Sequence, residues 1–343
     1  MTKLRILITM PRQPEAFDKL HADSGLELTL LDEPTGGHGI ALVDWPRGVI
    51  RDKDVLFCSG VLPANIRDMN ALRWLQMGCT GYEYAIDAGL GNTDIQVTNG
   101  LGTFDVPIAE WNIGMMIALA RDLRGMIRNQ ERGVWDRHAR FQKELRGSTV
   151  GFWGYGGLSR ETARLAKAMG LKVHVLVRGG VKKRRHYLIP GTGDPEGVLP
   201  DRVFHMEQKF EFLGGLDFLI VAMPQTPASI GAIGEAELRA LPRHACLLNP
   251  ARGPLVQEEA LLKALREGWI AGAALDTHYH YPMPPDHPLW KMPNVIMTPH
   301  ISGSGETPSY LPRAWDIFTQ NLARYRAGEP LLNELSRGQL RGE

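Results

Sequence analysis

Cysteine is scarce in this chain of 343 residues, since only Cys58, Cys79 and Cys246 occur and no two form a Cys-x-x-Cys pair. We therefore expect neither a disulfide framework nor a cysteine-rich zinc site, and a reducing compartment such as the cytoplasm fits. Long apolar runs are also missing: none approaches the ~18 residues of a membrane-spanning helix. The first residues lack the ~7–15 apolar residues of a secretory signal, so we expect no membrane association.

An excess of charge of either sign is lacking as well. The 39 Lys and Arg residues stand against 38 Asp and Glu residues, which gives a formal net charge of +1. This balance provides no overall attraction to nucleic acid or to an anionic membrane, so we expect neither as a partner. Ordinary hydrophobicity, at 43% of residues, excludes a disordered chain. At ~100–200 residues per domain, the length predicts two domains.

The order of apolar runs indicates an α/β fold in both halves of the chain. Strands are expected at residues 4–10, 26–31, 55–58 and 72–77, and then at 149–153, 172–177, 217–223, 245–249, 271–275 and 294–297. Helical patterns lie between most of them, including residues 159–169 and 256–266. Strands that alternate with helices favour parallel, doubly wound sheets. The second set has the layout of a six-stranded dinucleotide-binding sheet.

Two further helices stand outside this alternation. Residues 104–131 are predicted to form one long helix that is apolar around much of its girth. Such a helix is typical of a buried domain connector or of a subunit interface, and the pattern does not distinguish them. Near the end of the chain, residues 308–328 have the apolar stripe of an amphipathic helix.

A glycine turn lies between a predicted strand and a predicted helix. Gly154-Tyr155-Gly156-Gly157-Leu158-Ser159 directly follows residues 149–153. Gly154 permits a tight turn, Gly156 lets the backbone approach a pyrophosphate, and the helix start offers free N–H groups. Ser159 replaces the usual third glycine but is small enough for close helix–sheet packing. A glycine turn that binds no ligand is the alternative.

The end of the next strand bears on which dinucleotide binds. An acidic residue there favours NAD, but this sequence has Val177 followed by Arg178. Lys182, Lys183, Arg184 and Arg185 come just behind. A cationic strand end suits the 2′-phosphate of NADP, because arginine can pair a phosphate through two hydrogen bonds. We therefore prefer NADP, with NAD still possible; the alternative is that this cluster is a solvated loop face.

Three segments of the C-terminal half carry a family resemblance. They are Asn249-Pro-Ala-Arg252-Gly-Pro-Leu-Val256, Gly272-Ala-Ala-Leu-Asp276 and Pro293-Asn-Val-Ile-Met-Thr-Pro-His300. Together with the glycine turn, they resemble the D-isomer-specific 2-hydroxyacid dehydrogenases, in particular the glyoxylate/hydroxypyruvate reductase type. Further matching segments are Val97-Thr-Asn99, which leads into Val106-Pro-Ile-Ala-Glu110, and Asn321-Leu. The resemblance covers nearly the whole chain and is most specific between residues 147 and 303.

The resemblance implies two α/β domains with an active-site cleft between them. A flavodoxin-like catalytic domain would comprise residues 1–100 and 300–343, and a Rossmann-type dinucleotide-binding domain residues 101–299. It also implies a homodimer whose interface includes the 104–131 helix, and an NAD(P)-dependent oxidoreductase that acts on a small 2-ketoacid or 2-hydroxyacid. No metal is implied.

The same resemblance assigns roles to individual residues. Arg252 would bind the substrate carboxylate and polarise the keto oxygen, and His300 would act as general acid or base. Backbone N–H groups around Thr80, Gly81 and Tyr82 would hold the other side of the carboxylate. Besides the glycine turn, Arg178 and Lys182, the implied dinucleotide contacts are Met223, Pro224, Pro250, Ala251, Asp276 and Gly303.

One position departs from the family pattern. Members of the family have a glutamate five residues after the aspartate of the Ala-Leu-Asp segment, where it hydrogen-bonds the histidine; here Tyr281 stands there, and no glutamate occurs between Asp276 and His300. Tyr281 is predicted to hydrogen-bond the imidazole through its phenol. Carboxylate support could come only from a displaced group such as Asp286, or it is absent. A neutral partner supports the imidazolium less, which lowers the expected pKa of His300.

Other functions stay open at this point. A formate-type dehydrogenase of the same fold needs no general base, and a dinucleotide-binding scaffold needs no turnover. His278 and His280 suggest a metal pair, although a loop at the active-site mouth is the favoured interpretation. Residues 179–210 are longer than is usual for the family and contain turn-forming Ile189-Pro-Gly-Thr-Gly-Asp-Pro-Glu-Gly197. This segment is either a flap over the adenosine end of the dinucleotide or a surface excursion.

Overall fold

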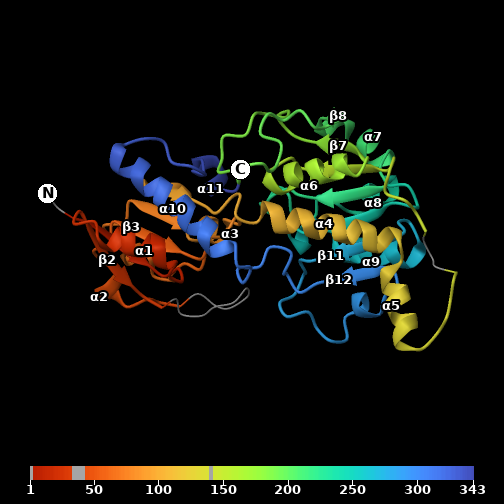
Figure 1. The fold of residues 1–343 in the computed structure, drawn as a ribbon, viewed down its shortest axis with the longest axis horizontal. Coiled ribbons are helices and arrows are strands. Elements are labelled where there is room, and N and C mark those ends of the chain that lie inside the picture. Colours follow the sequence, from red (N-terminus) through yellow and green to blue (C-terminus); the bar gives the residue numbers. More distant parts are fainter. Residues whose placement is uncertain (1–2, 33–42, 139–141) are drawn as a thin grey trace. The chain divides into compact units, whose positions relative to one another are not determined.

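The computed structural model describes residues 3–32, 43–138 and 142–343 and divides the chain into two compact units (Figure 1). Unit 1 comprises Met1–Phe104, Arg185–Tyr187 and Ser304–Glu343. Unit 2 comprises Asp105–Arg184 and Leu188–Gly303. The C-terminal segment therefore belongs to the same unit as the N-terminal segment.

Unit 1 contains a five-stranded parallel sheet in the order β2-β1-β3-β4-β5. Its strands are β1 (Leu4–Ile8), β2 (Leu26–Leu30), β3 (Val55–Cys58), β4 (Trp74–Met77) and β5 (Gln96–Thr98). Its helices are α1 (Pro14–His21), α2 (Arg47–Ile50), α3 (Glu83–Asp87), α10 (Tyr310–Ala327) and α11 (Arg337–Leu340). This strand order is that of flavodoxin-like sheets, as predicted for the catalytic half.

Aromatic packing explains why the C-terminal helix returns to unit 1. Phe318 of α10 stacks on Phe57 of β3 with ring centroids 4.2 Å apart, and on Trp74 of β4 at 5.5 Å. All three side chains are fully buried. Burial of a large apolar side chain contributes about 1.5–3 kcal/mol relative to its exposure. The amphipathic stripe of α10 thus covers one face of the sheet.

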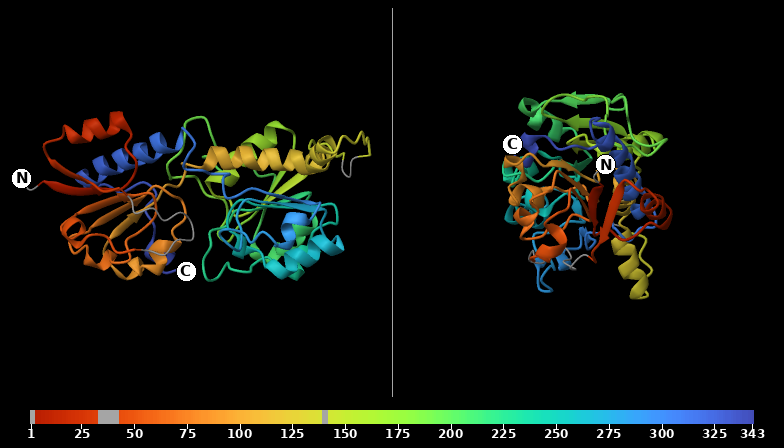
Figure 2. Two further views of the ribbon diagram at one scale, coloured as in Figure 1. Left: turned by 90° about the horizontal axis from the view of Figure 1, so that it is seen from below. Right: turned by 90° about the vertical axis from the view of Figure 1, so that its left-hand side faces the viewer.

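Unit 2 contains a seven-stranded parallel sheet in the order β12-β11-β10-β9-β6-β7-β8. Helices lie on both sides of this sheet (Figure 2). Its strands are β6 (Thr149–Trp153), β7 (Lys172–Leu176), β8 (Arg202–Phe204), β9 (Phe218–Val221), β10 (Cys246–Asn249), β11 (Gly272–Leu275) and β12 (Val295–Met297). Its helices are α4 (Asp105–Ala120), α5 (Leu123–Glu131), α6 (Gly157–Ala168), α7 (Lys209–Gly214), α8 (Glu235–Ala240) and α9 (Glu258–Glu267). The strand order reverses between β6 and β9, which is the switch point where doubly wound sheets bind ligands.

Both faces of this sheet are covered, because its strands are apolar at successive positions. Phe152 and Ile220 belong to one buried cluster, whereas their neighbours Trp153 and Leu219 belong to the other. Successive side chains of a strand point to opposite faces, so each strand contributes apolar side chains to the hydrophobic core on both sides of the sheet. The predicted α/β fold class is confirmed.

Three sequence predictions need correction. The sheet of unit 2 has seven strands rather than six, because Arg202-Val-Phe204 in the 179–210 segment pairs with β7 as β8. The short β5 was also not predicted. The single helix expected at residues 104–131 is two helices, since Asp122 adopts a left-handed φ of 47° between α4 and α5. Aspartate tolerates this conformation better than most residues.

The two halves of that helical region differ in burial. Asn112 of α4 donates to Thr162 of α6 at 3.1 Å, and α4 also buries Met116 and Leu119. The helix α5 buries none of its residues. The helix α4 is therefore part of the core of unit 2. Across residues 3–32, 43–138 and 142–343, no helix is both long and apolar enough to cross a membrane.

Candidate active site

Most of the predicted site residues follow strands of unit 2 at one edge of its sheet. Gly154 follows β6, Met223 and Pro224 follow β9, and residues 250–252 follow β10. Asp276 follows β11, and His300 lies three residues beyond β12. Because all strands are parallel, these positions meet at the carboxyl edge, where α/β sheets bind ligands.

The glycine turn fits a dinucleotide. Gly154 has a φ of +101°, and a Cβ there would lie 2.7 Å from the carbonyl oxygen of Ala222, so only glycine is compatible with this close approach. Around Gly156, in contrast, a Cβ would meet nothing within 4 Å. Gly156 caps α6 without a side-chain hydrogen bond, which leaves the first-turn N–H groups of Gly157 and Leu158 for an anion.

Ser159 takes the place of the third glycine without loss of packing. Its side chain is fully buried, and its hydroxyl donates to the carbonyl oxygen of Gly154 at 2.9 Å. The hydroxyl therefore ties the first turn of α6 to the glycine turn.

A buried ion pair lies beside the first residue of α6. A Cβ on Gly157 would be 2.2 Å from a carboxylate oxygen of Asp105, which pairs with Arg184 at 2.6 Å. Both charged side chains are less than a tenth exposed. The sequence grouped Arg184 with the cationic run but gave no sign of this partner, 79 residues away.

The rest of the cationic run divides into paired and unpaired residues. Lys183 pairs with Glu196 at 2.8 Å. Arg178, Lys182 and Arg185 are exposed, and none of them has an ion-pair partner within the described residues. Arg185 belongs to unit 1, so Arg178 and Lys182 are the exposed cations of the run in unit 2.

Tyr281 lies within hydrogen-bond distance of His300. Its hydroxyl lies 3.0 Å from Nδ1 of His300, and the backbone N–H of His278 donates to the same hydroxyl at 3.2 Å. Asp286, the other candidate, is exposed and makes no side-chain hydrogen bond in the described part of the chain. The predicted hydrogen bond is present, while the catalytic role of Tyr281 stays a prediction.

Asp276 holds the loop that carries His300. Its carboxylate is fully buried and accepts hydrogen bonds from the hydroxyls of Thr298 (2.6 Å) and Ser302 (2.5 Å). It also accepts the N–H groups of Ile301 (2.9 Å) and Ser302 (3.0 Å). The backbone carbonyl of Asp276 accepts the N–H of His300 at 2.8 Å. Asp276, predicted as a dinucleotide contact, thus positions the residues on both sides of the imidazole.

Replacing Asp276 with asparagine is expected to lower the free energy of unfolding by about 2–4 kcal/mol. An amide offers one acceptor oxygen where the carboxylate offers two, so donors of Ser302 or Thr298 lose their acceptor in a buried site. Urea denaturation of both proteins measures this difference. Asp286→Asn removes an exposed carboxylate from a neighbouring loop and should change stability by less than about 0.5 kcal/mol. Equal effects of the two substitutions would contradict this account.

Arg252 lies in a loop that other segments hold in place. The side chain of Asn249 accepts the N–H of Ala251 at 3.1 Å and donates to the carbonyl oxygen of Arg252 at 2.8 Å. A Cβ on Gly253 would lie 2.4 Å from the carbonyl group of His278. The missing side chain of Gly253 lets the Arg252 loop contact the segment that leads to Tyr281.

Thr80, Gly81 and Tyr82 belong to unit 1, where they follow β4 at the carboxyl edge of its own sheet. The side-chain amide of Asn99 donates to the carbonyl oxygen of Thr80 at 2.7 Å. Gly303, the remaining predicted contact, is the last residue of unit 2.

Two histidines near Tyr281 lie beside the carboxylate of Glu258. His287 Nε2 lies 2.7 Å from one carboxylate oxygen of Glu258, and His280 Nε2 lies 3.9 Å from the other. His278 Nε2 donates to the carbonyl oxygen of Thr298 at 2.8 Å. Among the described residues, no three His, Cys, Asp or Glu side chains are grouped to hold a metal ion.

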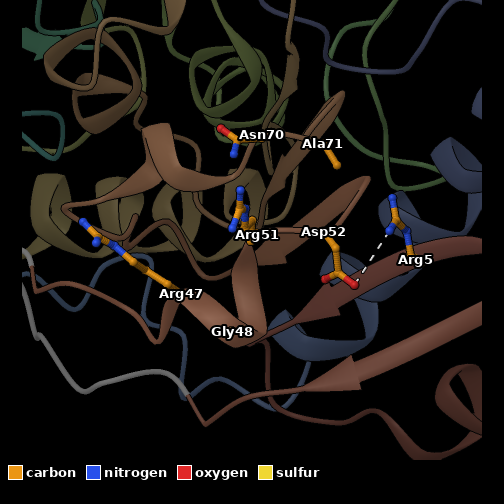
Figure 3. A pocket seen from close by; sticks show the side chains of 7 residues that line it. All are labelled: Arg5, Arg47, Gly48, Arg51, Asp52, Asn70 and Ala71. Atoms are coloured by element: carbon orange, nitrogen blue, oxygen red, sulfur yellow. Dashed lines mark ion pairs between the residues drawn. The ribbon is translucent and has the colours of Figure 1, made fainter.

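A separate hollow of about 590 Å³ lies in unit 1 and is lined by Arg5, Arg47, Gly48, Arg51, Asp52, Asn70 and Ala71 (Figure 3). Two of its arginines are paired, Arg5 with Asp54 at 3.0 Å and Arg47 with Asp68 at 2.8 Å. The hollow contains none of the predicted site residues.

Comparison with known proteins agrees with this geometry. The family model for the NAD-binding domain of D-isomer-specific 2-hydroxyacid dehydrogenases matches residues 113–302. A glyoxylate reductase of Thermofilum pendens is 31% identical over 299 residues, which are 83% of this chain and 84% of that protein. Among solved structures, an NADPH-dependent glyoxylate/hydroxypyruvate reductase from Sinorhizobium meliloti, in complex with NADP and sulfate, has a TM-score of 0.75 at 24% identity and covers 98% of this chain and 99% of its own. A D-isomer-specific 2-hydroxyacid dehydrogenase family protein from Aeromonas salmonicida has a TM-score of 0.78 at 24% identity, covering 98% and 100%.

The doubly wound sheet of unit 2 and the glycine turn before α6 define a dinucleotide-binding protein. The chain belongs to the D-isomer-specific 2-hydroxyacid dehydrogenase family, as the family model and the relative from Thermofilum pendens show. It is an NAD(P)-dependent D-2-hydroxyacid dehydrogenase.

Proposed function

We propose that this enzyme uses NADPH to reduce a small 2-ketoacid such as glyoxylate or hydroxypyruvate. The observation that carries the proposal is the hydrogen bond of Tyr281 to His300, on the same sheet edge as Arg252 and the glycine turn. Support for this substrate class comes from the relatives, which include glyoxylate reductases that are 31%, 32% and 33% identical to this chain. In this proposal unit 2 binds the dinucleotide, and unit 1 contributes Thr80, Gly81 and Tyr82 to substrate binding.

The preference for NADPH is supported by the end of β7. Val177 replaces the acidic residue that would bind the ribose hydroxyls of NAD, and Arg178 and Lys182 offer two exposed cations to a 2′-phosphate. Bound NADPH would supply the hydride, and the pyrophosphate would be held by first-turn N–H groups of α6 next to Gly156.

In this proposal, residues of unit 2 bind the negatively charged substrate and donate the proton to its keto oxygen. The guanidinium of Arg252 binds the substrate carboxylate and polarises the keto oxygen, which it can do because it stays charged and presents planar donors. The imidazolium of His300 gives its Nε2 proton to that oxygen. Tyr281 accepts the Nδ1–H of His300 before and after this transfer, so the ring keeps one orientation throughout.

Turnover is tested with purified protein, saturating NADPH and a panel of 2-ketoacids, followed at 340 nm. We expect consumption of NADPH with kcat/KM about 10–100 times that with NADH, the effect of charge-assisted hydrogen bonds to one phosphate. Tight NADPH binding without turnover of any ketoacid would indicate a dinucleotide-binding scaffold instead. Turnover of formate with NADP⁺ would indicate the formate-type reaction. Equal affinity for NADH and NADPH would remove the proposed cofactor preference.

Substitution of Tyr281 tests the support of His300. In Tyr281→Glu, a carboxylate next to the imidazolium should move the alkaline limb of the pH–rate profile for ketoacid reduction upward by about 1 pH unit or more. Tyr281→Phe removes the hydrogen bond, and kcat should fall about 3–10-fold. The wild-type profile should therefore fall at lower pH than that of Tyr281→Glu. Identical profiles for the wild type and Tyr281→Glu would show that Tyr281 does not act through His300.

The homodimer is proposed on α5. Leu123, Met126 and Ile127 are 40%, 37% and 54% exposed on a helix that buries no residue, and a second copy of the chain would cover them. Sedimentation of the wild type should give a dimer, and Ile127→Asp should weaken it. A monomeric wild-type protein would contradict the proposed homodimer. The low cysteine content fits the cytoplasm as the proposed compartment.

A further inference from the structure

The unusually long 179–210 segment contains a loop that folds back on itself. We define the insertion loop as residues 181–184 and 188–199, which lie in unit 2 between β7 and β8 (Figure 1). The N–H of Arg184 donates to the carbonyl oxygen of Pro195 at 2.8 Å, which closes the loop. Gly197 has a φ of +75°, and a Cβ there would lie 2.6 Å from the side chain of Val181, so the two limbs touch.

A buried carboxylate anchors this loop to the glycine turn. Asp194 is 3% exposed and accepts the backbone N–H groups of Gly197, Val198 and Leu199, each at 3.0 Å. The hydroxyl of Tyr155 donates to the same carboxylate at 2.8 Å. Burial by itself would raise the pKa of Asp194, but the hydrogen bonds from Leu199, Val198 and Tyr155 and the positive charge of Arg160 together keep that pKa below its usual value. Tyr155, the middle residue of Gly154-Tyr-Gly156, thus connects the dinucleotide turn to the insertion loop.

A buried arginine makes the second connection. Arg160 of α6 is 6% exposed, and its guanidinium lies 4.9 Å from the centre of the Tyr155 ring. It donates to the carbonyl oxygens of Asp194 and Lys182, one in each limb of the loop, and to that of Tyr155 at 3.3 Å. The backbone of Lys182 is therefore held from α6, while its side chain stays exposed.

We propose that Tyr155, Arg160 and Asp194 are positioning residues that hold Lys182 at the 2′-phosphate of NADPH, so that the insertion loop determines cofactor choice. This inference rests on the proposed NADPH preference. A flexible lysine loses side-chain entropy when it binds a phosphate. If the backbone of the loop is already fixed, no further backbone entropy is lost on binding, and the affinity is higher. The loop is accordingly a built part of the dinucleotide site rather than a surface excursion.

The test compares Kd for NADPH and NADH by fluorescence titration of the intact enzyme. Lys182→Ala should raise Kd for NADPH about 10-fold and leave Kd for NADH within about 2-fold. Lys183→Ala, the matched control, removes a neighbouring lysine that pairs with Glu196 and should leave both constants unchanged. If Lys182→Ala changes neither constant, the assignment of Lys182 to the phosphate fails, and the positioning inference falls with it.

The positioning residues are tested on the same ratio of dissociation constants. Tyr155→Phe and Asp194→Asn should each lower the preference for NADPH about 3–10-fold without a comparable change in Kd for NADH. In the Lys182→Ala background the same substitutions should have no further effect on the preference for NADPH, because the lysine side chain that they position is absent. An equal loss of both affinities would show a merely structural role, and an independent effect in the double variant would also overturn the inference.

Hydrogen exchange separates this inference from the proposed function. The amides of Gly197, Val198 and Leu199 should exchange faster in Tyr155→Phe than in the wild type, whatever the cofactor. Faster exchange with an unchanged cofactor preference would overturn the positioning role of Tyr155. The proposed binding of the 2′-phosphate by Arg178 and Lys182 would not be affected by that result. Unchanged exchange would show that Tyr155 does not anchor the loop.

Discussion

Replacing His300 with asparagine is expected to lower kcat for ketoacid reduction about 10²–10⁴-fold, the usual contribution of a positioned general acid. The substitution removes the Nε2 proton that the keto oxygen would receive. Asparagine suits this position because His300 has a φ of +57°, and asparagine is among the few residues that tolerate the left-handed region. The loop held by Asp276 should therefore keep its conformation. Steady-state kinetics at saturating NADPH measures the loss.

Two measurements show whether the loss belongs to the chemical step. Kd for NADPH should stay within about 2-fold of the wild type, since no hydrogen bond to the first turn of α6 is changed. His280→Asn replaces an exposed histidine of the neighbouring segment and should leave kcat nearly unchanged. A fully active His300→Asn enzyme would exclude His300 as the general acid.

Arg252→Lys is expected to lower kcat/KM for the ketoacid about 10²–10³-fold, the usual cost of losing one oriented donor to a developing negative charge. Lysine keeps the positive charge but presents no planar pair of donors, so it cannot bind the carboxylate and polarise the keto oxygen together. Both kcat and KM should be affected, because in its proposed role Arg252 would contact the substrate before and during reduction.

The control for Arg252→Lys is Arg239→Lys on α8. Arg239 forms an exposed ion pair with Glu235 at 2.8 Å, and a surface pair of this kind contributes little to stability. This variant should keep the wild-type kcat/KM. If Arg252→Lys also keeps the wild-type kcat/KM, a positive charge is sufficient at this position. The proposal that the guanidinium both binds the carboxylate and polarises the keto oxygen would then be wrong.

The elements that the sequence predicted are those with a local signal. The strand at residues 149–153, the glycine turn and the start of α6 lie within about fifteen consecutive residues, and their pattern of apolar and small side chains is sufficient to predict them. The contact of Tyr281 with His300 was predicted from the spacing after Asp276, combined with the family resemblance. The break at Asp122 was not, because the apolar periodicity of residues 104–131 continues through it.

The contacts that only the tertiary structure revealed join residues far apart in the chain. Tyr155 meets Asp194 across 39 positions, and Asp105 meets Arg184 across 79. No periodicity links such residues, and a buried charge gives no sequence sign of which partner will neutralise it. The cationic run illustrates the consequence: it reads as one cluster, yet Arg184 and Lys183 have acidic partners while Arg178 and Lys182 have none among the described residues.

The sequence by itself determined the α/β class, the dinucleotide turn and the family, because each depends on residue types at short, fixed spacings. The tertiary structure decided which charges remain available at the end of β7, how the insertion loop is held, and what orients His300. These depend on burial and on hydrogen-bond geometry between distant segments, which exist only after the two sheets have formed.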